Sequence, residues 1–184
     1  MTKLKSTVKF RDVTNYGNEP DQMWQIEAEK LIPWLFGKGA DVGCGLRTIK
    51  PDAIRVDLDE NVRPEILASS DNLPSKDGEL DYITSVHTFE HFPDQRKVLV
   101  EWLRVLKKGG IVAMVHPDVD FTLPQNQRET EQSLKDNPFN RHYFEKNRET
   151  FVKMMEGMTN LGFKILDSGV ACPNWSFFII LEKL

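Results

Sequence analysis

The feature that most constrains the fold of this chain is a series of short apolar runs separated by a helical pattern. The runs are Ala40 to Gly43, Ile54 to Leu58, Leu80 to Val86 and Ile111 to Val115. Between the last two, residues 94–108 carry apolar side chains at the spacing of one helix face. Strands buried on both faces of a parallel sheet have such continuous apolar runs, and helical connections join them. The pattern predicts an α/β fold, a doubly wound and mostly parallel sheet with helices on both faces.

Helices and strands are also predicted on both sides of this region. An apolar stripe from Trp24 to Leu35 follows the helix-start residues Asn18 and Pro20. A second stripe, from Phe151 to Leu161, predicts a helix near the other end of the chain. Two strands are predicted after it, at Phe163 to Leu166 and at Trp175 to Leu181.

Length and composition narrow the class of protein. A chain of 184 residues predicts a single domain over residues 1–184. Because 28 acidic residues outnumber 24 basic ones, no general attraction to nucleic acid or anionic lipid is expected. The longest apolar runs are five residues, against roughly 20 for a membrane span. The start lacks a secretory signal pattern, and two cysteines, Cys44 and Cys172, make no disulfide framework, so a cytoplasmic location is expected.

Two features at predicted strand ends indicate a ligand site, because ligands of such sheets bind beyond the carboxyl ends of the strands. In residues 41–45, Asp-Val-Gly-Cys-Gly, the glycines allow a sharp turn and a close approach of the backbone to a ligand. Asp57 ends the second run, where a carboxylate can accept hydrogen bonds from both hydroxyls of a ribose. Taken singly, an ordinary tight turn and a solvated carboxylate explain these features as well.

The spacing between the two features discriminates between cofactors. Only residues 46–53 separate Gly45 from the second run, and Pro51 interrupts them. A helical crossover takes a dozen or more residues, so no normal helix fits there. A dinucleotide needs that helix because its N-terminal amides receive the pyrophosphate. S-adenosylmethionine (SAM) carries no phosphate, so the spacing counts against NAD and much less against SAM.

A set of motifs resembles a known family. The segments are Asp41-Val42-Gly43-Cys44-Gly45, Val56-Asp57, Asp71-Asn72-Leu73-Pro74, residues 80–91 and residues 104–110. Their order and spacing are similar to those of class I SAM-dependent methyltransferases, specifically the small type 11 group, with a shortened first crossover. The resemblance covers roughly residues 39–117, and the closing helix and two strands resemble the antiparallel C-terminal strand pair of that fold.

The resemblance implies SAM as the cofactor and a set of binding residues. The turn residues would surround the methionyl part, Asp57 would hold the ribose hydroxyls, and Leu58 would lie beside the adenine. The implied cofactor-binding residues are Asp41, Gly43, Cys44, Gly45, Asp57, Leu58, Ser70, Asp71, Leu73 and Ser85. The chain departs from the family pattern at Ser69, where an aspartate usually reaches the adenine, so backbone groups of Ser70 are expected to carry more of that contact.

The histidines suggest a catalytic role and a metal site, and we expect only the first. His87 and His116 stand at predicted strand ends, so both are candidate catalytic bases. Residues 87–91, His-Thr-Phe-Glu-His, also match an inverted zinc-protease motif, which needs both histidines on one face of a long helix. The preceding strand and Pro93 leave hardly one helical turn, so no metal is expected at this pair.

The sequence thus predicts methyl transfer from SAM to an unidentified acceptor, a small metabolite or a sugar-like precursor. Residues 116–146 have little periodicity and are expected to form a lid that selects the acceptor. One alternative is a non-catalytic SAM-binding or scaffold protein. A small NAD-dependent oxidoreductase is disfavoured by the missing crossover helix. No nucleic-acid or membrane partner is expected.

Overall fold

A computed structural model of the 184-residue chain describes residues 22–122, 131–136 and 141–184. The predicted helix start at Asn18 and Pro20 therefore lies outside the described residues, as do residues 123–130 and 137–140 of the predicted lid. Within the described ranges, no helix has both the length and the apolar character needed to cross a bilayer.

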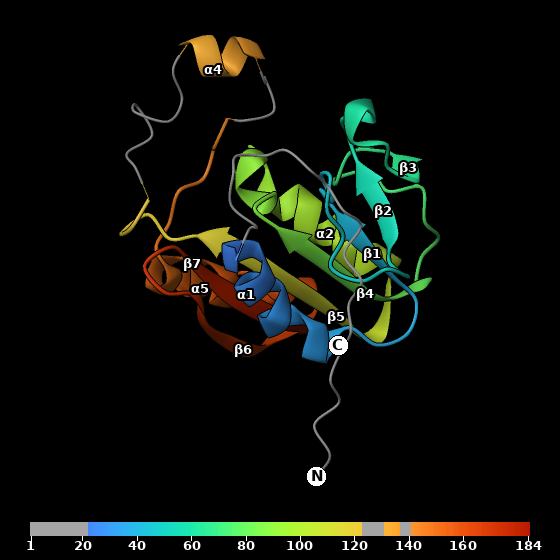
Figure 1. Cartoon of the computed structure of the whole chain (residues 1–184). Helices are drawn as coiled ribbons and strands as arrows, with labels where there is room; N and C mark the ends of the chain where they lie inside the picture. Colours follow the sequence, from blue (N-terminus) through green and yellow to red (C-terminus); the bar gives the residue numbers. More distant parts are fainter. Residues whose placement is uncertain (1–21, 123–130, 137–140) are drawn as a thin grey trace, which may run out of the picture.

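A seven-stranded sheet forms the centre of the fold, in the order β3-β2-β1-β4-β5-β7-β6 (Figure 1). The strands are β1 (Gly39–Val42), β2 (Ile54–Asp57), β3 (Ile66–Leu67), β4 (Leu80–Val86), β5 (Leu106–Pro117), β6 (Phe163–Cys172) and β7 (Ser176–Lys183). Every pairing from β3 to β5 is parallel, whereas β7 pairs antiparallel with both β5 and β6. The predicted mostly parallel sheet with an antiparallel C-terminal pair is confirmed.

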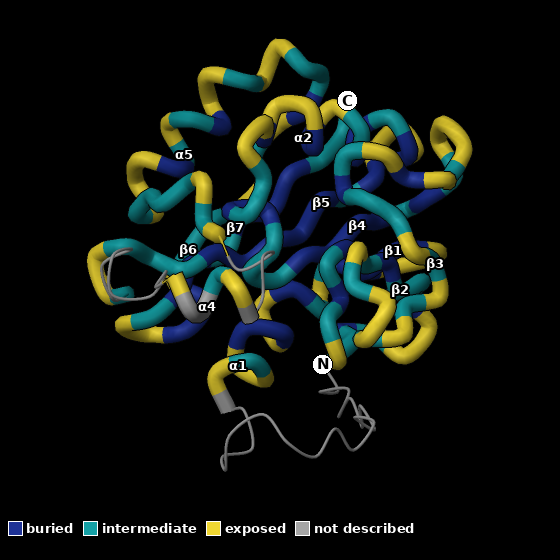
Figure 2. The backbone as a smooth tube through the Cα atoms, turned by 90° about the horizontal axis from the view of Figure 1, so that it is seen from above, coloured by how far each residue is buried: buried dark blue, intermediate teal, exposed yellow. Residues whose placement is uncertain are grey.

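Helices cover both faces of this sheet. Viewed from above, α1 lies on one side of the strands and α2 and α5 lie on the other (Figure 2). The α-helices in the described residues are α1 (Gln22–Leu31), α2 (Gln95–Val105), α4 (Glu131–Asp136) and α5 (Arg148–Glu156). Short 3-10 turns add η1 (Ile32–Trp34), η2 (Glu60–Val62), η3 (Phe89–His91) and η5 (Thr159–Leu161).

The alternation of side chains along β5 divides the buried residues into two cores. Val112 and Met114 belong to the core beneath α2 and α5, whereas Ala113 and Val115 belong to the core beneath α1. Successive side chains of a strand point to opposite faces, so a continuous apolar run supplies both cores at once. This explains why the central strands have no polar alternation in the sequence.

Several element boundaries differ from the sequence prediction. Helix α2 ends at Val105 and β5 begins at Leu106, so the predicted continuation of the helix to Lys108 is wrong. Leu106 is extended, with φ −76° and ψ 143°, and its fully buried side chain gains more from the core than from another helical turn. Strand β6 continues to Cys172, beyond the predicted Leu166, and the two-residue β3 was not predicted.

The crossing from β1 to β2 contains no helix, as the spacing predicted. Residues 43–53 form only turns and bends. Two of them, Ile49 and Ala53, are buried in the core beneath α1. A short crossing of this kind places the end of β2 directly beside the end of β1.

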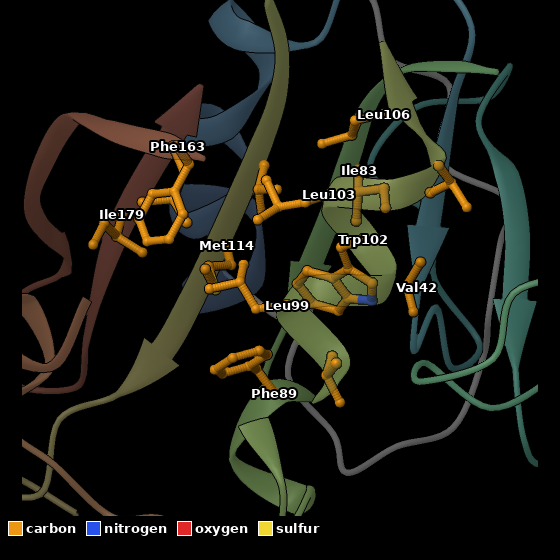
Figure 3. Close-up of a cluster of buried hydrophobic side chains, with 14 of the residues drawn as sticks. Val42, Ile83, Phe89, Leu99, Trp102, Leu103, Leu106, Met114, Phe163 and Ile179 are labelled. Carbon is orange, nitrogen blue, oxygen red and sulfur yellow. The ribbon is translucent and has the colours of Figure 1, made fainter. Parts of the chain in front are cut away.

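Trp102 joins the core beneath α2 to the loop that follows β3. Its side chain is fully buried at the centre of the apolar cluster shown in Figure 3. The indole Nε1 donates a hydrogen bond to the backbone oxygen of Ser70 at 3.0 Å. A buried indole N–H needs such a partner, and the carbonyl is held in return. The core therefore fixes the position of Ser70, which the sequence analysis assigned to cofactor binding.

We predict that Trp102→Phe lowers the free energy of unfolding by about 2–4 kcal/mol, because it leaves a cavity and an unsatisfied carbonyl at Ser70. Urea unfolding followed by circular dichroism measures the change. The control is Val100→Ala in the same helix, where the side chain is 48% exposed. It should stay within about 0.5 kcal/mol of the unsubstituted protein. Equal losses in the two variants would contradict the assignment.

Candidate active site

A cavity of about 740 Å³ opens beyond the carboxyl ends of β1, β2 and β4. Part of its wall comes from residues that the sequence analysis assigned to cofactor binding or catalysis. These residues are Asp41, Gly43, Cys44, Gly45, Asp57, Leu58, Ser70 and His87. The cavity lies where parallel strands of this fold class present their ligand sites.

The turn after β1 depends on glycine at position 43. Gly43 has φ +73°, and a Cβ at this position would overlap the side chain of Thr88. The backbone nitrogens of Gly43 and Cys44 both donate to the oxygen of Val56, at 2.8 and 3.2 Å. The turn is therefore bonded to β2, and its backbone lies close against the strand ends.

Asp57 connects the ends of the two strands. Its Oδ2 accepts a hydrogen bond from the backbone nitrogen of Gly45 at 2.8 Å, and its Oδ1 accepts one from Asp59 at 3.0 Å. A carboxylate offers about four lone-pair positions, so each oxygen retains acceptor capacity. The carboxylate is half-buried and faces the cavity, which suits it to bind a pair of vicinal hydroxyls.

Asp41 holds the crossing that follows this turn through hydrogen bonds. Its buried carboxylate accepts hydrogen bonds from the backbone nitrogen of Ile49 at 2.9 Å and from Thr48 Oγ1 at 3.2 Å. Burial raises the pKa of Asp41 to about 6, although these bonds oppose the shift. Burial also raises the pKa of the neighbouring Cys44 thiol to about 12, so that thiol stays protonated at neutral pH.

Three predicted cofactor residues do not line the cavity. Ser85 is buried, and its Oγ donates to the backbone oxygen of Val42 at 2.9 Å. Leu73 is part of the core beneath α2. Asp71 pairs with Lys97, with 2.8 Å between Oδ2 and Nζ. Internal packing or pairing accounts for all three side chains.

His87 reaches the cavity in a strained backbone conformation, φ 52°, which is uncommon for a residue with a Cβ. Its Nε2 lies 2.9 Å from Glu27 Oε1, and its Nδ1 lies 3.7 Å from Glu90 Oε1. Burial alone would lower the pKa of His87, but these two carboxylates raise it to about 10. The imidazole is therefore protonated at neutral pH.

His116, the other candidate base, is not brought to the cavity. It follows Val112 and Met114 on the face of β5 that α2 and α5 cover, and it is 3% exposed. Its ring lies against Phe151, with centroids 4.3 Å apart, and is stacked on Phe177 at 5.6 Å. Strand alternation thus points this histidine into the core.

The sequence analysis assigned none of three further cavity residues to the site, although two of them, Arg141 and Tyr143, fall within the predicted lid of residues 116–146. Trp24 of α1 lines the cavity, with the guanidinium carbon of Arg47 5.8 Å from its ring centroid. Arg141 and Tyr143 line it from the end of the long connection, and the Tyr143 nitrogen donates to the oxygen of Glu90 at 2.9 Å. The helical spacing of Trp24 indicated only a core residue, and no local pattern connects position 143 to the strand ends.

Comparisons with known proteins agree with this geometry. A family model described as a methyltransferase domain matches residues 40–114. An uncharacterized protein of Methanocaldococcus jannaschii is 30% identical over 152 residues, which cover 76% of this chain and 70% of that protein. The ubiquinone/menaquinone biosynthesis C-methyltransferase UbiE of Campylobacter jejuni is 27% identical over 113 residues, 61% of this chain and 46% of that enzyme.

A solved structure shares the fold over nearly the whole chain. It is a SAM-dependent methyltransferase of Thermotoga maritima, with a TM-score of 0.62 and 21% identity, covering 87% of this chain and 88% of that one. The matched domain begins in β1, includes the glycine turn and Asp57, and ends in β5. The chain therefore belongs to the class I SAM-dependent methyltransferases, and SAM is its cofactor.

Proposed function

We propose that the cavity holds SAM along the ends of β1 and β2 and a small-molecule acceptor beside His87. The observation that carries this proposal is the bond between the backbone of Gly45 and the carboxylate of Asp57. This bond holds two groups together in one wall of the cavity: a turn whose backbone can approach a ligand closely, and a carboxylate suited to ribose hydroxyls. The buried position of Ser70 beside this wall supports a contact with the adenine.

The remaining wall supports a small, oxygen-rich acceptor. Trp24 and Tyr143 supply aromatic surface, whereas Arg47, Arg141 and His87 supply hydrogen-bond donors and positive charge. A cavity of about 740 Å³ falls within the range of small-molecule sites. Donors of this kind favour a metabolite or a sugar-like precursor that bears hydroxyl or anionic groups.

The proposed mechanism rests on positioning. SAM supplies a methyl group on a sulfonium, and in-line transfer to an oriented acceptor needs little covalent help from the protein. Both nitrogens of His87 face carboxylates, so this residue keeps its protons and supplies positive charge beside the acceptor instead of removing a proton. For His116 we propose a structural role, because phenylalanine rings surround it away from the cavity.

A reducing location, the cytoplasm, is the proposed setting. Cys44 and Cys172 are both buried free thiols. Free thiols persist in compartments that keep cysteine reduced. Cys44 also lines the cavity, where oxidation would interfere with the cofactor site.

We predict that the protein binds SAM and S-adenosylhomocysteine (SAH) but not NAD, because the turn after β1 has no following helix to receive a pyrophosphate. Isothermal calorimetry at neutral pH measures all three ligands. Tight NAD binding without detectable SAM or SAH binding would overturn the cofactor placement.

Asp57→Ala should weaken SAM binding by roughly 10- to 100-fold, since hydrogen bonds to a charged group are worth about 1.5–3 kcal/mol. Asp59→Ala is the matched control and should have a much smaller effect, because the Asp59 carboxylate caps η2 through the nitrogen of Asn61. Binding of methylthioadenosine that lacks its ribose hydroxyls distinguishes two causes of a weaker affinity, a lost contact with the ribose and a disordered turn at Gly45. The affinity for this analogue should fall less than that for SAM, and equal losses would mean that Asp57 acts only by holding Gly45.

An acceptor screen scored by the appearance of SAH tests the acceptor side. With an acceptor in hand, Tyr143→Ala should raise its KM about 10-fold through loss of aromatic contact, while SAM affinity stays unchanged. Phe121→Ala is the control, since this exposed aromatic ring in the same connection does not line the cavity. SAM binding without turnover on any acceptor would instead favour the non-catalytic alternative.

A further inference from the structure

The four histidines of the chain gather around one buried carboxylate, that of Glu90. His116 Nδ1 lies 3.4 Å from Oε2, and His87 Nδ1 lies 3.7 Å from Oε1. On the other side, one ligand atom each from Glu90, His91 and His142 lies within 4.8 Å of the others. Imidazole nitrogens beside a carboxylate are ligands of divalent transition metals.

We propose that Glu90, His91 and His142 bind one divalent transition-metal ion of the zinc class at the edge of the active-site cavity. Around a tetrahedral ion with bonds of about 2.0–2.1 Å, ligand atoms lie about 3.4 Å apart. The observed ligand atoms lie within 4.8 Å of one another. Side-chain rotations that move each atom by about an ångström would bring them to the tetrahedral spacing.

The state of Glu90 points to such an ion. The residue is 1% exposed, and neither carboxylate oxygen accepts a hydrogen bond from any described residue. The imidazoles of His87 and His116 lie 3.7 and 3.4 Å away, at ion-pair distance but without a hydrogen bond, so the buried carboxylate lacks a direct donor. A bound cation would supply the missing interaction directly.

The surroundings of the two histidine rings already orient them as metal ligands. His91 Nδ1 lies 3.0 Å from the backbone oxygen of Arg141, so this nitrogen carries the hydrogen and Nε2 is left to coordinate. His142 Nδ1 lies 3.5 Å from Glu145 Oε1, which is an ion-pair distance. The two rings are 4.5 Å apart and nearly perpendicular, at 85°.

The backbone also holds the ligand-bearing segments together without a metal. The backbone nitrogens of Tyr143 and Phe144 donate hydrogen bonds to the backbone oxygen of Glu90 at 2.9 and 3.2 Å. These bonds join the segment of His142 to η3, which carries Glu90 and His91. A preorganised set of this kind loses less conformational entropy when an ion binds.

The other two histidines are unsuited to the same ion. His87 Nε2 is hydrogen-bonded to Glu27 at 2.9 Å. His116 is enclosed by phenylalanine rings. The metal site therefore differs from the His87 and His91 pair of the zinc-protease motif, for which no metal was expected.

The position of the site connects it to the acceptor. His91, Arg141 and Tyr143 line the cavity, so an ion on His91 and His142 would fix the wall formed by these residues. The link between the metal ion and acceptor binding rests on the proposed function, whereas metal binding itself does not. Occupancy should therefore change acceptor affinity and leave SAM affinity unchanged.

The test uses the full chain without a histidine tag, stripped of metal with a chelator. Calorimetric titration with Zn²⁺ should show one site per chain, and Co²⁺ should give the visible absorption of a nitrogen and oxygen ligand set. His91→Gln, His142→Gln and Glu90→Gln should each weaken Zn²⁺ binding at least about 100-fold. His87→Gln is the matched control and should keep Zn²⁺ affinity within a few-fold.

Two further measurements keep the outcomes distinct. Circular dichroism of each metal-free variant shows whether it folds, and SAM calorimetry on the same samples tests the cofactor site separately. The proposal is wrong if the unsubstituted protein binds no Zn²⁺ or Co²⁺. It is also wrong if folded His91→Gln and His142→Gln bind as tightly as the control, or if His87→Gln loses as much affinity as they do.

Discussion

The active-site end of the fold depends on the buried carboxylate of Asp41. By accepting hydrogen bonds from Thr48 and Ile49, it holds a crossing that has no helix of its own. Because the crossing is held, its apolar residues can fill the core beneath α1, and β2 can pair in parallel with β1. The carboxylate of Asp57 then meets the backbone of Gly45. One buried acid thus holds the crossing, while the parallel pairing of β1 and β2 sets the distance between the two strand ends.

Charge is distributed unevenly around the cavity. The wall made by β1 and β2 presents backbone groups and the carboxylate of Asp57, which suits the hydroxyls of a ribose. Arg47, Arg141 and His87 also line the cavity and add positive charge to it. Buried Glu27 balances the charge of His87, and Ser176 donates a further hydrogen bond to Glu27. A cationic cofactor and an oxygen-rich acceptor would thus each find groups of complementary charge in the cavity.

The period of two along a strand decides which strand-end residues reach the cavity. His116 continues the alternation of β5 into the core beneath α2 and α5. His87, which directly follows β4, does not continue the alternation of that strand. Its left-handed backbone conformation turns the side chain toward Glu27. Two histidines at equivalent ends of neighbouring strands therefore have different surroundings, one enclosed by aromatic rings and one at the cavity wall.

The sequence alone determined the α/β class, the four parallel strands, the helix-free crossing, and the glycine turn with Asp57, because each depends on local periodicity or on spacing within one unit. The end of α2 at Val105 escaped prediction, because burial of Leu106 in β5 outweighed the helix-stop pattern of the glycines that follow. Only the tertiary structure decided that Trp24 lines the cavity and that His142 lies beside Glu90, since residues far apart in the chain meet there through packing that no local pattern encodes.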